Sequence, residues 1–342
     1  MAKTHVGDAG PRRVKLSAFT VVDEFPAPVA GSRDRYAEVF QLADAAESSG
    51  LHALWIAEHH FQPGGLCPCP PILLAAAATR THRLRLGALV SVLPFHNPIE
   101  VAEQYAMVDR LSGGRLNLGV GSGYIPLEFQ GFGVDPQTKR ERFDRALETL
   151  LGAFRGEPLT VPGPHGGTVR VNVVPVQRPS PPITIAVQRR EALPFVARRG
   201  ASVAMVPYAT VQDLPELAEQ IREYRRHLPT GSTASVSVAL HIYAGDRPEL
   251  AREALQGYLD GRLATQSTFY QEKVRQDPRQ ADARAIERSG FALFGSPSDV
   301  AERLKPFGEA GVDEVLGIFD FGGLAAGEVA DSVRRLGARL TA

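Results

Sequence analysis

The sequence contains little cysteine and no surplus of charge of either sign. Its 342 residues include two cysteines, Cys67 and Cys69, which are separated by one proline. That spacing is poor for a disulfide, so a reducing cytoplasm is the simpler expectation for this chain. Lysine plus arginine and aspartate plus glutamate each total 38, which gives a formal net charge of +0. This balance lacks the electrostatic footprint of a nucleic-acid-binding protein.

Long apolar runs and two common catalytic motifs are also missing. No run of eighteen apolar residues occurs, which argues against a membrane span. The first residues, Met1 to Arg13, are polar and lack the apolar stretch of a signal peptide, so we expect a flexible N-terminal segment over 1–13. The absence of a Gly-x-Ser-x-Gly elbow and of a Walker loop removes the main support for serine hydrolysis and phosphoryl transfer.

Strand-like and helix-like segments alternate through the rest of the chain. This alternation predicts an α/β fold with a parallel sheet, and about eight strands over this length favour a (β/α)₈ TIM barrel. We expect one domain over 1–342, with loop insertions over the carboxyl-terminal face. The expected strands are 14–20, 53–57, 84–93, 116–120, 183–187, 203–206, 236–243 and 314–319, and the expected helices are 36–49, 72–81, 98–111, 140–154, 191–199, 214–227, 297–310 and 327–340.

Two segments exceed what a minimal barrel needs. Residues 156–182 are rich in glycine and proline and include a β-like stretch, Val169–Val176. Residues 257–290 are polar and charged, without a clear hydrophobic period. We interpret 257–290 as an insertion or lid, mobile or helical, over the active face.

The most informative motif is Glu58-His59-His60, which follows the expected strand 53–57. One acid and two imidazoles therefore lie at the carboxyl end of a strand, where parallel α/β folds carry out chemistry. The alternatives are a structural cluster and a metal site. Cys67-Pro68-Cys69 lies nearby, but a single intervening residue does not match zinc-ligand spacing, so we expect no metal.

Four further features could contact a ligand. Gly119-Val120-Gly121-Ser122-Gly123-Tyr124 follows a strand, but its spacing does not match the dinucleotide fingerprint. Gln188-Arg189-Arg190 lies between a strand and a helix, and is either a phosphate site or a solvated basic loop. Arg140 could contribute from a neighbouring helix. Gly87, within a strand, indicates a bulge, the approach of a flat ligand, or simply a need for a small residue.

Taken together, several segments resemble the luciferase-like flavin-dependent monooxygenases. The segments are Trp55–Phe61, Leu93–Pro98, Asp109–Gly121, Glu128-Phe129, Gly131–Gly133 and Gly295–Pro297, and the resemblance covers roughly Val14 to Leu340. It implies a (β/α)₈ barrel that binds a flavin at the carboxyl ends of its strands. It also implies that flavin supplies the oxygen chemistry while the protein positions substrate and excludes water.

The resemblance assigns roles to individual residues. It makes His59 the imidazole near the flavin, a candidate acid–base group or peroxide stabiliser, because imidazole exchanges protons near neutral pH. Glu58 would orient His59 or brace the loop, and His60 would be structural. A non-prolyl cis peptide is expected at Leu89-Val90, beneath the flavin ring. The other residues matched to the cofactor are Gly121, Ser122, Tyr124, Arg140, Gln188, Arg189 and Cys69.

The resemblance therefore implies an FMN-dependent monooxygenase that uses reduced flavin and O₂ on a small organic substrate, with a separate flavin reductase as partner. A deazaflavin-dependent hydride-transfer enzyme on the same fold is one alternative, and a flavin-binding protein without turnover is another. A metal hydrolase built on the His pair is a third. Homodimers are common in the family, but the sequence carries no interface signature. Substrate identity and reaction subtype are not encoded in these motifs.

Overall fold

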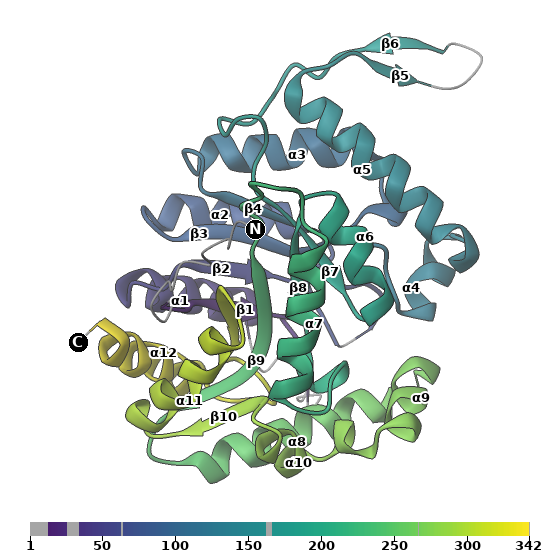
Figure 1. The fold of residues 1–342 in the computed structure, drawn as a ribbon. Helices are drawn as coiled ribbons and strands as arrows, with labels where there is room; N and C mark the ends of the chain where they lie inside the picture. The colour runs from purple at the N-terminus through teal and green to yellow at the C-terminus, as the bar shows by residue number, and fades with distance from the viewer. Residues whose placement is uncertain (1–12, 26–33, 63, 162–165, 266, 342) are drawn as a thin grey trace, which may run out of the picture.

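A closed barrel of eight parallel strands forms the centre of the protein in the computed structural model, which describes residues 13–25, 34–62, 64–161, 166–265 and 267–341 (Figure 1). The ring closes where Lys15 pairs with Glu314. The predicted (β/α)₈ barrel is therefore confirmed, while the expected N-terminal segment lies, Arg13 apart, outside the described residues. The ring strands are β1 (Lys15–Thr20), β2 (Ala53–Ile56), β3 (Arg85–Val92), β4 (Leu116–Gly121), β7 (Ile183–Val187), β8 (Ser202–Met205), β9 (Val236–Ala244) and β11 (Glu314–Ile318).

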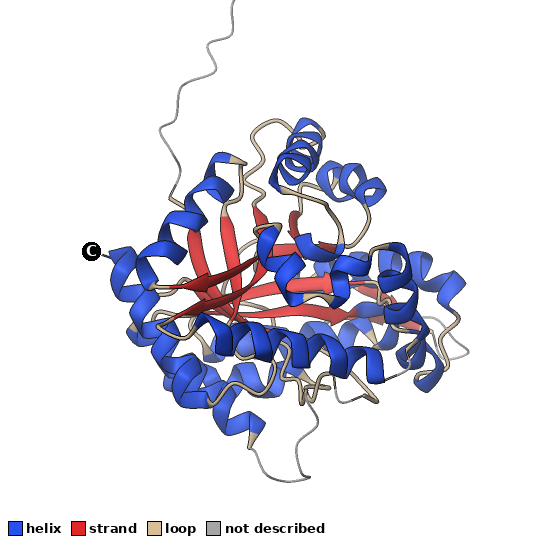
Figure 2. Ribbon diagram, turned by 90° about the horizontal axis from the view of Figure 1, so that it is seen from below, coloured by secondary structure: helices blue, strands red, loops and turns tan. Residues whose placement is uncertain are grey.

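Helices surround the strands, as Figure 2 shows. Neighbouring helices pack against each other around the ring, including α1 with α12, α2 with α3 and α6 with α7. Within the described ranges, no helix combines the length and apolarity that crossing a membrane requires. The helices are α1 (Arg35–Ser48), α2 (Pro70–Arg80), α3 (Pro98–Leu111), α4 (Pro126–Gly131), α5 (Lys139–Arg155), α6 (Leu193–Arg198), α7 (Leu214–Arg226), α8 (Pro248–Ala264), α9 (Thr268–Gln276), α10 (Ala283–Arg288), α11 (Pro297–Glu309) and α12 (Ala326–Thr341).

The two extra segments have defined structures. A small antiparallel hairpin, β5 (Leu159–Val161) and β6 (Gly167–Val169), extends beside the end of α5 (Figure 1). The β-like reading of Val169–Val176 was wrong beyond Val169, because residues 170–176 form no strand. Residues 257–290 contain the end of α8, then α9 and α10, so the helical alternative is the correct one. A further strand, β10 (Ala292–Gly295), pairs with β9 outside the ring.

A buried carboxylate ties the barrel interior together. Glu314 Oε1 on β11 accepts hydrogen bonds from Ser17 Oγ at 2.5 Å and Trp55 Nε1 at 2.9 Å. The Trp55 ring occupies the space that a side chain at Gly87 would need, since a Cβ there would lie 2.3 Å from the ring. Gly87 thus serves packing, the simplest of the readings that the sequence left open. Burial raises the pKa of Glu314 despite these donors.

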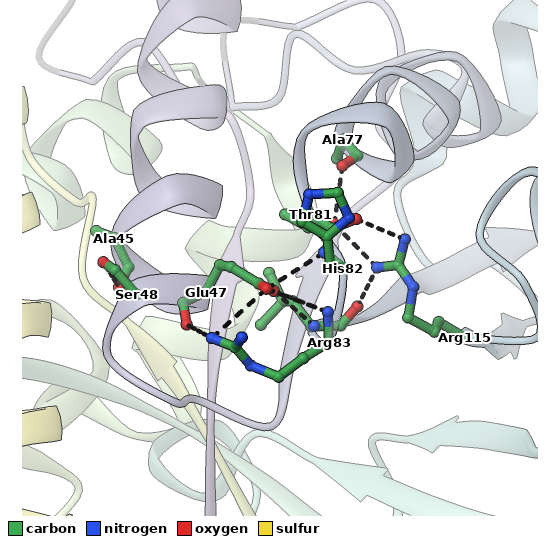
Figure 3. A network of polar contacts seen from close by, with 9 residues as sticks. Ala45, Glu47, Ser48, Ala77, Thr81, His82, Arg83 and Arg115 are labelled. Carbon is green, nitrogen blue, oxygen red and sulfur yellow. Dashed lines mark hydrogen bonds and ion pairs between the residues drawn. The ribbon is translucent and has the colours of Figure 1, made fainter.

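A second polar network holds the turn that leads from α2 into β3 (Figure 3). The Glu47 carboxylate on α1 accepts the backbone N–H groups of His82, Arg83 and Leu84 at 2.7–3.2 Å. The guanidinium of Arg115 donates to backbone carbonyl oxygens at the end of α2 and the start of β3. Both side chains satisfy backbone groups that neither the helix nor the strand can pair. The network therefore fixes where β3 begins.

Glu47→Gln should lower the free energy of unfolding at neutral pH by about 1–2 kcal/mol, because charge-assisted hydrogen bonds to the turn are lost. Burial would raise the pKa of Glu47, but the three backbone donors outweigh burial and hold this pKa below its usual value. The carboxylate's contribution is therefore present above the unfolded-state pKa and is lost as pH falls through the folded-state value. Urea unfolding of the wild type and the variant at several pH values tests this. If the difference between their free energies of unfolding did not narrow in acid, the prediction would be contradicted.

Candidate active site

Glu58-His59-His60 follows β2 at the carboxyl end of the barrel, where the predicted motif places it. The chain then returns so that the backbone N–H of His59 donates to the Cys67 carbonyl oxygen at 3.1 Å. Gly65 is needed for this close approach, because a Cβ there would lie 2.4 Å from His59 Cβ. The loop is thus closed on itself, and the side chains of Glu58 and His60 are buried.

His59 is oriented by a carboxylate other than the one expected. Its Nδ1–H donates to Glu128 Oε1 at 2.9 Å, and the same oxygen accepts the backbone N–H of His60 at 3.1 Å. Glu128 lies on α4 and is 1% exposed. With Nδ1 engaged, Nε2 of His59 is the nitrogen left to meet a ligand. The expectation that Glu58 orients His59 by direct contact is therefore wrong, and its alternative role as a brace stays a prediction.

Glu58 instead joins β2 to β3. Its Oε1 accepts from Nε2–H of His60 at 3.2 Å and of His96 at 2.7 Å, and its Oε2 accepts the Val92 backbone N–H at 3.3 Å. Burial would raise the pKa of Glu58, but the His60 and His96 donors outweigh it and lower this pKa. Burial lowers the pKa of His96, whereas Glu58 raises it, and the net shift is upward. The cluster therefore holds a charged carboxylate between two imidazoles.

The same three side chains are the arrangement in the described residues that most resembles a metal site. The ligand atoms of Glu58, His60 and His96 lie within 4.8 Å of one another. One Glu and two His form a set that zinc accepts. Here, however, the two imidazoles already donate to the carboxylate, so the cluster satisfies its own polar groups. Whether it binds a cation is testable and is treated below.

Both cysteines lie close to this cluster and are weakly acidic. Burial raises the pKa of Cys67 to about 12, and burial followed by the negative charge of Glu58 raises that of Cys69. Cys69 precedes α2 and is half-buried. A thiol that stays protonated at neutral pH is a poor nucleophile and a poor metal ligand.

The strand next to β2, β3, carries an irregularity. The Leu89–Val90 peptide bond is cis, as the resemblance implies, and the pairing of β3 with β4 shifts in register after Ala88. A Cβ at Gly119 would lie 2.4 Å from the Ala88 carbonyl oxygen, and one at Gly121 would lie 2.6 Å from Val90 Cγ2. The glycines of β4 therefore let it approach the bulge closely. Gly121 is therefore needed for close packing against Val90, and the cofactor contact predicted for it stays a prediction.

Two cations, Lys139 and Arg189, lie near the loop that follows β4. Lys139, at the start of α5, donates through Nζ to the Gly123 carbonyl oxygen at 3.3 Å. Burial and then the nearby charge of Arg189 lower the pKa of Lys139, so the two cations face a common region. Neither forms an ion pair with any described residue. Ser122 and Gln188 flank them, each half-buried. An anion placed here would relieve the repulsion between the cations.

Arg140 and Arg190 are engaged elsewhere. The Arg140 guanidinium lies 3.3 Å from the Phe195 ring centroid, over that ring. Arg190 pairs with Glu219 at 2.8 Å and Glu223 at 2.7 Å on α7. Lys139, one position before Arg140, is thus the residue that contacts the loop after β4, and the cofactor role predicted for Arg140 stays a prediction. Neither Lys139 nor Glu128 was identified as a site residue from the sequence.

Aromatic side chains connect His59 to the segment 257–290. The Tyr124 ring lies edge-on to His59, with ring centroids 6.3 Å apart, and it contacts Phe269 of α9 at 4.8 Å. Phe269 in turn adjoins Tyr270 at 5.5 Å. The helices of this segment therefore pack against the residues around the imidazole.

The fold and this site define a class: a barrel with a carboxylate-oriented imidazole at the carboxyl end of β2, a bulged β3 and two cations near the loop after β4. A family profile described as luciferase-like monooxygenase matches residues 14–314. The chain belongs to this family, and the predicted enzyme class, a flavin-dependent oxidoreductase, is confirmed at the level of the family.

Several curated proteins are similar in sequence. An uncharacterized protein of Sinorhizobium fredii is 39% identical over 196 residues, which are 57% of each chain, so the match spans little more than half of that relative. The 4-hydroxyprotoasukamycin monooxygenase of Streptomyces nodosus subsp. asukaensis is 28% identical over 289 residues, 79% of this chain and 76% of the relative. The oxygenase component of flavin-dependent trigonelline monooxygenase from Acinetobacter baylyi is 26% identical over 64% of this chain and 62% of its own length.

Solved structures share the fold. Monooxygenase RslO1 from Streptomyces bottropensis has a TM-score of 0.79 at 24% identity, covering 96% of this chain and 99% of its own. The oxygenating constituent of 3,6-diketocamphane monooxygenase from Pseudomonas putida, in complex with FMN, has a TM-score of 0.78 at 18% identity, with coverages of 96% and 98%. A coenzyme F420 dependent reductase from Methanopyrus kandleri has a TM-score of 0.70 at 16% identity, with coverages of 96% and 99%. At these identities the likeness establishes the fold alone.

Proposed function

We propose that the protein is an FMN-dependent monooxygenase that uses reduced flavin, delivered by a separate reductase, and O₂ to oxygenate a small organic substrate. The observations that carry the proposal are the hydrogen bond of 2.9 Å between His59 Nδ1 and Glu128 Oε1 and the cis peptide bond at Leu89–Val90. Two similar proteins, a flavin-dependent oxygenase component and an oxygenating constituent in complex with FMN, support the cofactor and the reductase.

The donor set suits FMN. Lys139 and Arg189 would hold its phosphate, with the loop of Ser122 alongside, because two unpaired cations favour a doubly charged anion. The bulged backbone at Leu89 and Val90 would support the ring system. Reduced flavin, when bound, supplies the electrons and the centre for O₂ activation. The protein contributes position, exclusion of water and a proton.

His59 would hold or deliver that proton at Nε2. Because Nδ1–H donates to Glu128, the neutral imidazole is fixed in the tautomer that leaves Nε2 free to accept. When Nε2 takes up a proton, the Glu128 carboxylate stabilises the resulting positive charge. Glu58 does not touch His59; it would act by holding the ends of β2 and β3 at a fixed spacing.

Lys139→Ala should weaken FMN binding about tenfold or more while changing riboflavin binding by less than about threefold, because only FMN carries the phosphate. Arg189→Ala should show the same selectivity. Fluorescence titration of each flavin into each variant measures both constants.

The matched control is Arg190→Ala, since Arg190 is paired with Glu219 and Glu223 and should affect both flavins alike. Equal losses for FMN and riboflavin in Lys139→Ala would remove the phosphate site from the proposal.

The cofactor and the reaction are tested together by mixing the protein with reduced FMN or with a reduced deazaflavin and recording O₂ consumption. We expect O₂ uptake only with reduced FMN, and its coupling to product once a substrate is present. The reduced deazaflavin is included because F420 dependent enzymes share this fold. Turnover with the deazaflavin and without O₂ uptake would replace the proposal with hydride transfer, and the absence of turnover with either would leave a flavin-binding protein.

A metal at Glu58, His60 and His96 is tested by chelation. We expect dialysis against EDTA to leave oxygenation unchanged, because the three side chains satisfy one another by hydrogen bonds. Loss of activity that returns on addition of Zn²⁺ would show that the cluster is a working metal site.

A further inference from the structure

Arg262, near the end of α8, lies among aromatic rings and not among carboxylates. Its Cζ is 4.0 Å from the ring centroid of Tyr270 and 5.4 Å from that of Tyr258, and its Nη1 donates to the Tyr208 hydroxyl at 2.8 Å. Throughout the described ranges, no carboxylate forms an ion pair with it. A cation withdrawn from water without a counter-ion is costly, so this arrangement favours the arrival of an anion.

One edge of the guanidinium is unused. Nε is buried and has no hydrogen-bond partner in the described part of the chain, and Nη2 donates to no described residue either. The N–H groups of Nε and Nη2 are parallel, and this fork is the geometry that a carboxylate accepts with two oxygens. Tyr208 holds the opposite side of the group, so the free edge has a fixed direction.

His241, on β9, is a second unpartnered polar group at the same place. It is 1% exposed, and neither ring nitrogen has a hydrogen-bond partner among the described residues. Its ring contacts Tyr208 at 5.5 Å and Tyr258 at 5.7 Å, the tyrosines that also surround Arg262. Burial and then the charge of Arg262 lower the pKa of His241 to about 3, so its ring is neutral. Orphaned groups of this kind are rare in folded proteins and indicate a missing partner.

These groups belong to the same region as the reaction imidazole. Tyr124 contacts the His59 ring and Phe269, Phe269 contacts Tyr270, and Tyr270 lies against Arg262. A continuous series of ring contacts, here called the aromatic path, thus joins the His59 ring to Tyr270, which lies against Arg262. Rings of this kind favour a flat, conjugated molecule as a neighbour.

We propose that the substrate is an organic acid with an aromatic or conjugated body, whose carboxylate pairs with the Nε–H and Nη2–H groups of Arg262. The body lies along the aromatic path, which brings its far end to His59. His241 supplies a hydrogen bond to a polar group of the bound acid. This inference rests on the proposed function, because it names the substrate class of the same site.

The segment 257–290 must move for the acid to enter. Beside Arg262, between α8 and α9, the cavity measures about 20 Å³ and is also lined by Lys273. That volume holds about one water molecule. On this proposal the acid therefore enters only if α9 shifts away from α8.

The test uses three aromatic acids of increasing size, benzoate, 2-naphthoate and anthracene-9-carboxylate, each paired with its neutral primary amide. Calorimetric titration into the full chain, with and without FMN, gives the dissociation constants. We expect at least one acid to bind about tenfold or more tighter than its amide, since a charge-assisted bidentate pair is lost in the amide. Arg262→Met should abolish this preference, and Arg262→Lys should restore part of it.

The controls separate this inference from folding and from the proposed function. Arg284→Met removes an exposed arginine of the same segment and should keep the preference. Tyr208→Phe removes only the hydroxyl that holds Arg262 and should reduce the preference, even if Arg262→Met fails to fold. Equal affinity for every acid and its amide, or the same preference in wild type and in Arg262→Lys and Tyr208→Phe, would overturn the inference. Acid preference without FMN binding would instead overturn the proposed function alone.

Discussion

His59→Ala should lower the rate of oxygenation about a hundredfold or more, because a positioned acid–base group contributes about 10²–10⁴-fold to a rate. FMN affinity should stay near normal, since the phosphate would be held by Lys139 and Arg189 on the other side of the site. Single-turnover measurements with reduced FMN, O₂ and substrate give the rate, and fluorescence titration gives the affinity. The combination of lost rate and kept affinity is the expected signature.

His82→Ala is the matched control for this variant, because His82 is exposed and lies at the opposite end of the barrel. Its rate should equal that of the wild type. Unchanged turnover in His59→Ala would show that this imidazole takes no part in the reaction. A parallel loss of rate and of FMN affinity would make His59 a binding residue.

Glu128→Gln should lower the rate by about 10- to 100-fold, the usual range for losing the partner that orients a functional imidazole. The amide keeps the size of the carboxylate but not its charge, so it no longer stabilises protonated His59. It can also present its NH₂ group to Nδ1, which would move the proton of His59 to Nε2. In that tautomer Nε2 could no longer accept a proton.

The division of the loss between kcat and KM distinguishes this role from a purely structural one. In the variant the loss should lie in kcat, because protonated His59 has lost its counter-charge. Glu128→Asp should recover part of the rate, and Glu141→Gln, on the exposed side of α5, should behave as wild type. An unchanged kcat with a lowered melting temperature would reduce Glu128 to a packing residue.

Local patterns predicted the elements that local chemistry determines. The helix Pro98–Leu111 and the strand Ile183–Val187 occur with the predicted bounds, because proline and glycine mark their ends and their apolar residues follow one period. The sequence reading missed the short elements α4, β5 and β10, which are six, three and four residues long, and also the 17-residue helix α8. The short segments contain too little of a repeating pattern to be identified, and their structure depends on what they pack against. The end of α8 lies in the segment 257–290, which was read as having no clear hydrophobic period.

Partnerships across the chain were harder to predict than elements. Glu128 is 69 residues from His59, and no local sequence pattern around either residue predicts that the two side chains form a hydrogen bond. Lys139 and Arg140 are adjacent on α5, where one step turns the side chain by about 100°, so a basic pair alone does not say which residue faces the loop. The resemblance to the family located the cis bond at Leu89–Val90. The sequence could not show that Arg262 would lack a carboxylate partner.

The environment of the two thiols beside Glu58 affects how readily they are oxidised. A protein that handles O₂ and reduced flavin is exposed to hydrogen peroxide from uncoupled turnover, and peroxide oxidises cysteine through the thiolate. Burial and the neighbouring carboxylate keep the thiols of Cys67 and Cys69 protonated at neutral pH. We therefore expect both thiols to form sulfenic acid slowly. Glu58, which joins the ends of β2 and β3, thus also helps to keep the two neighbouring thiols in their unreactive form.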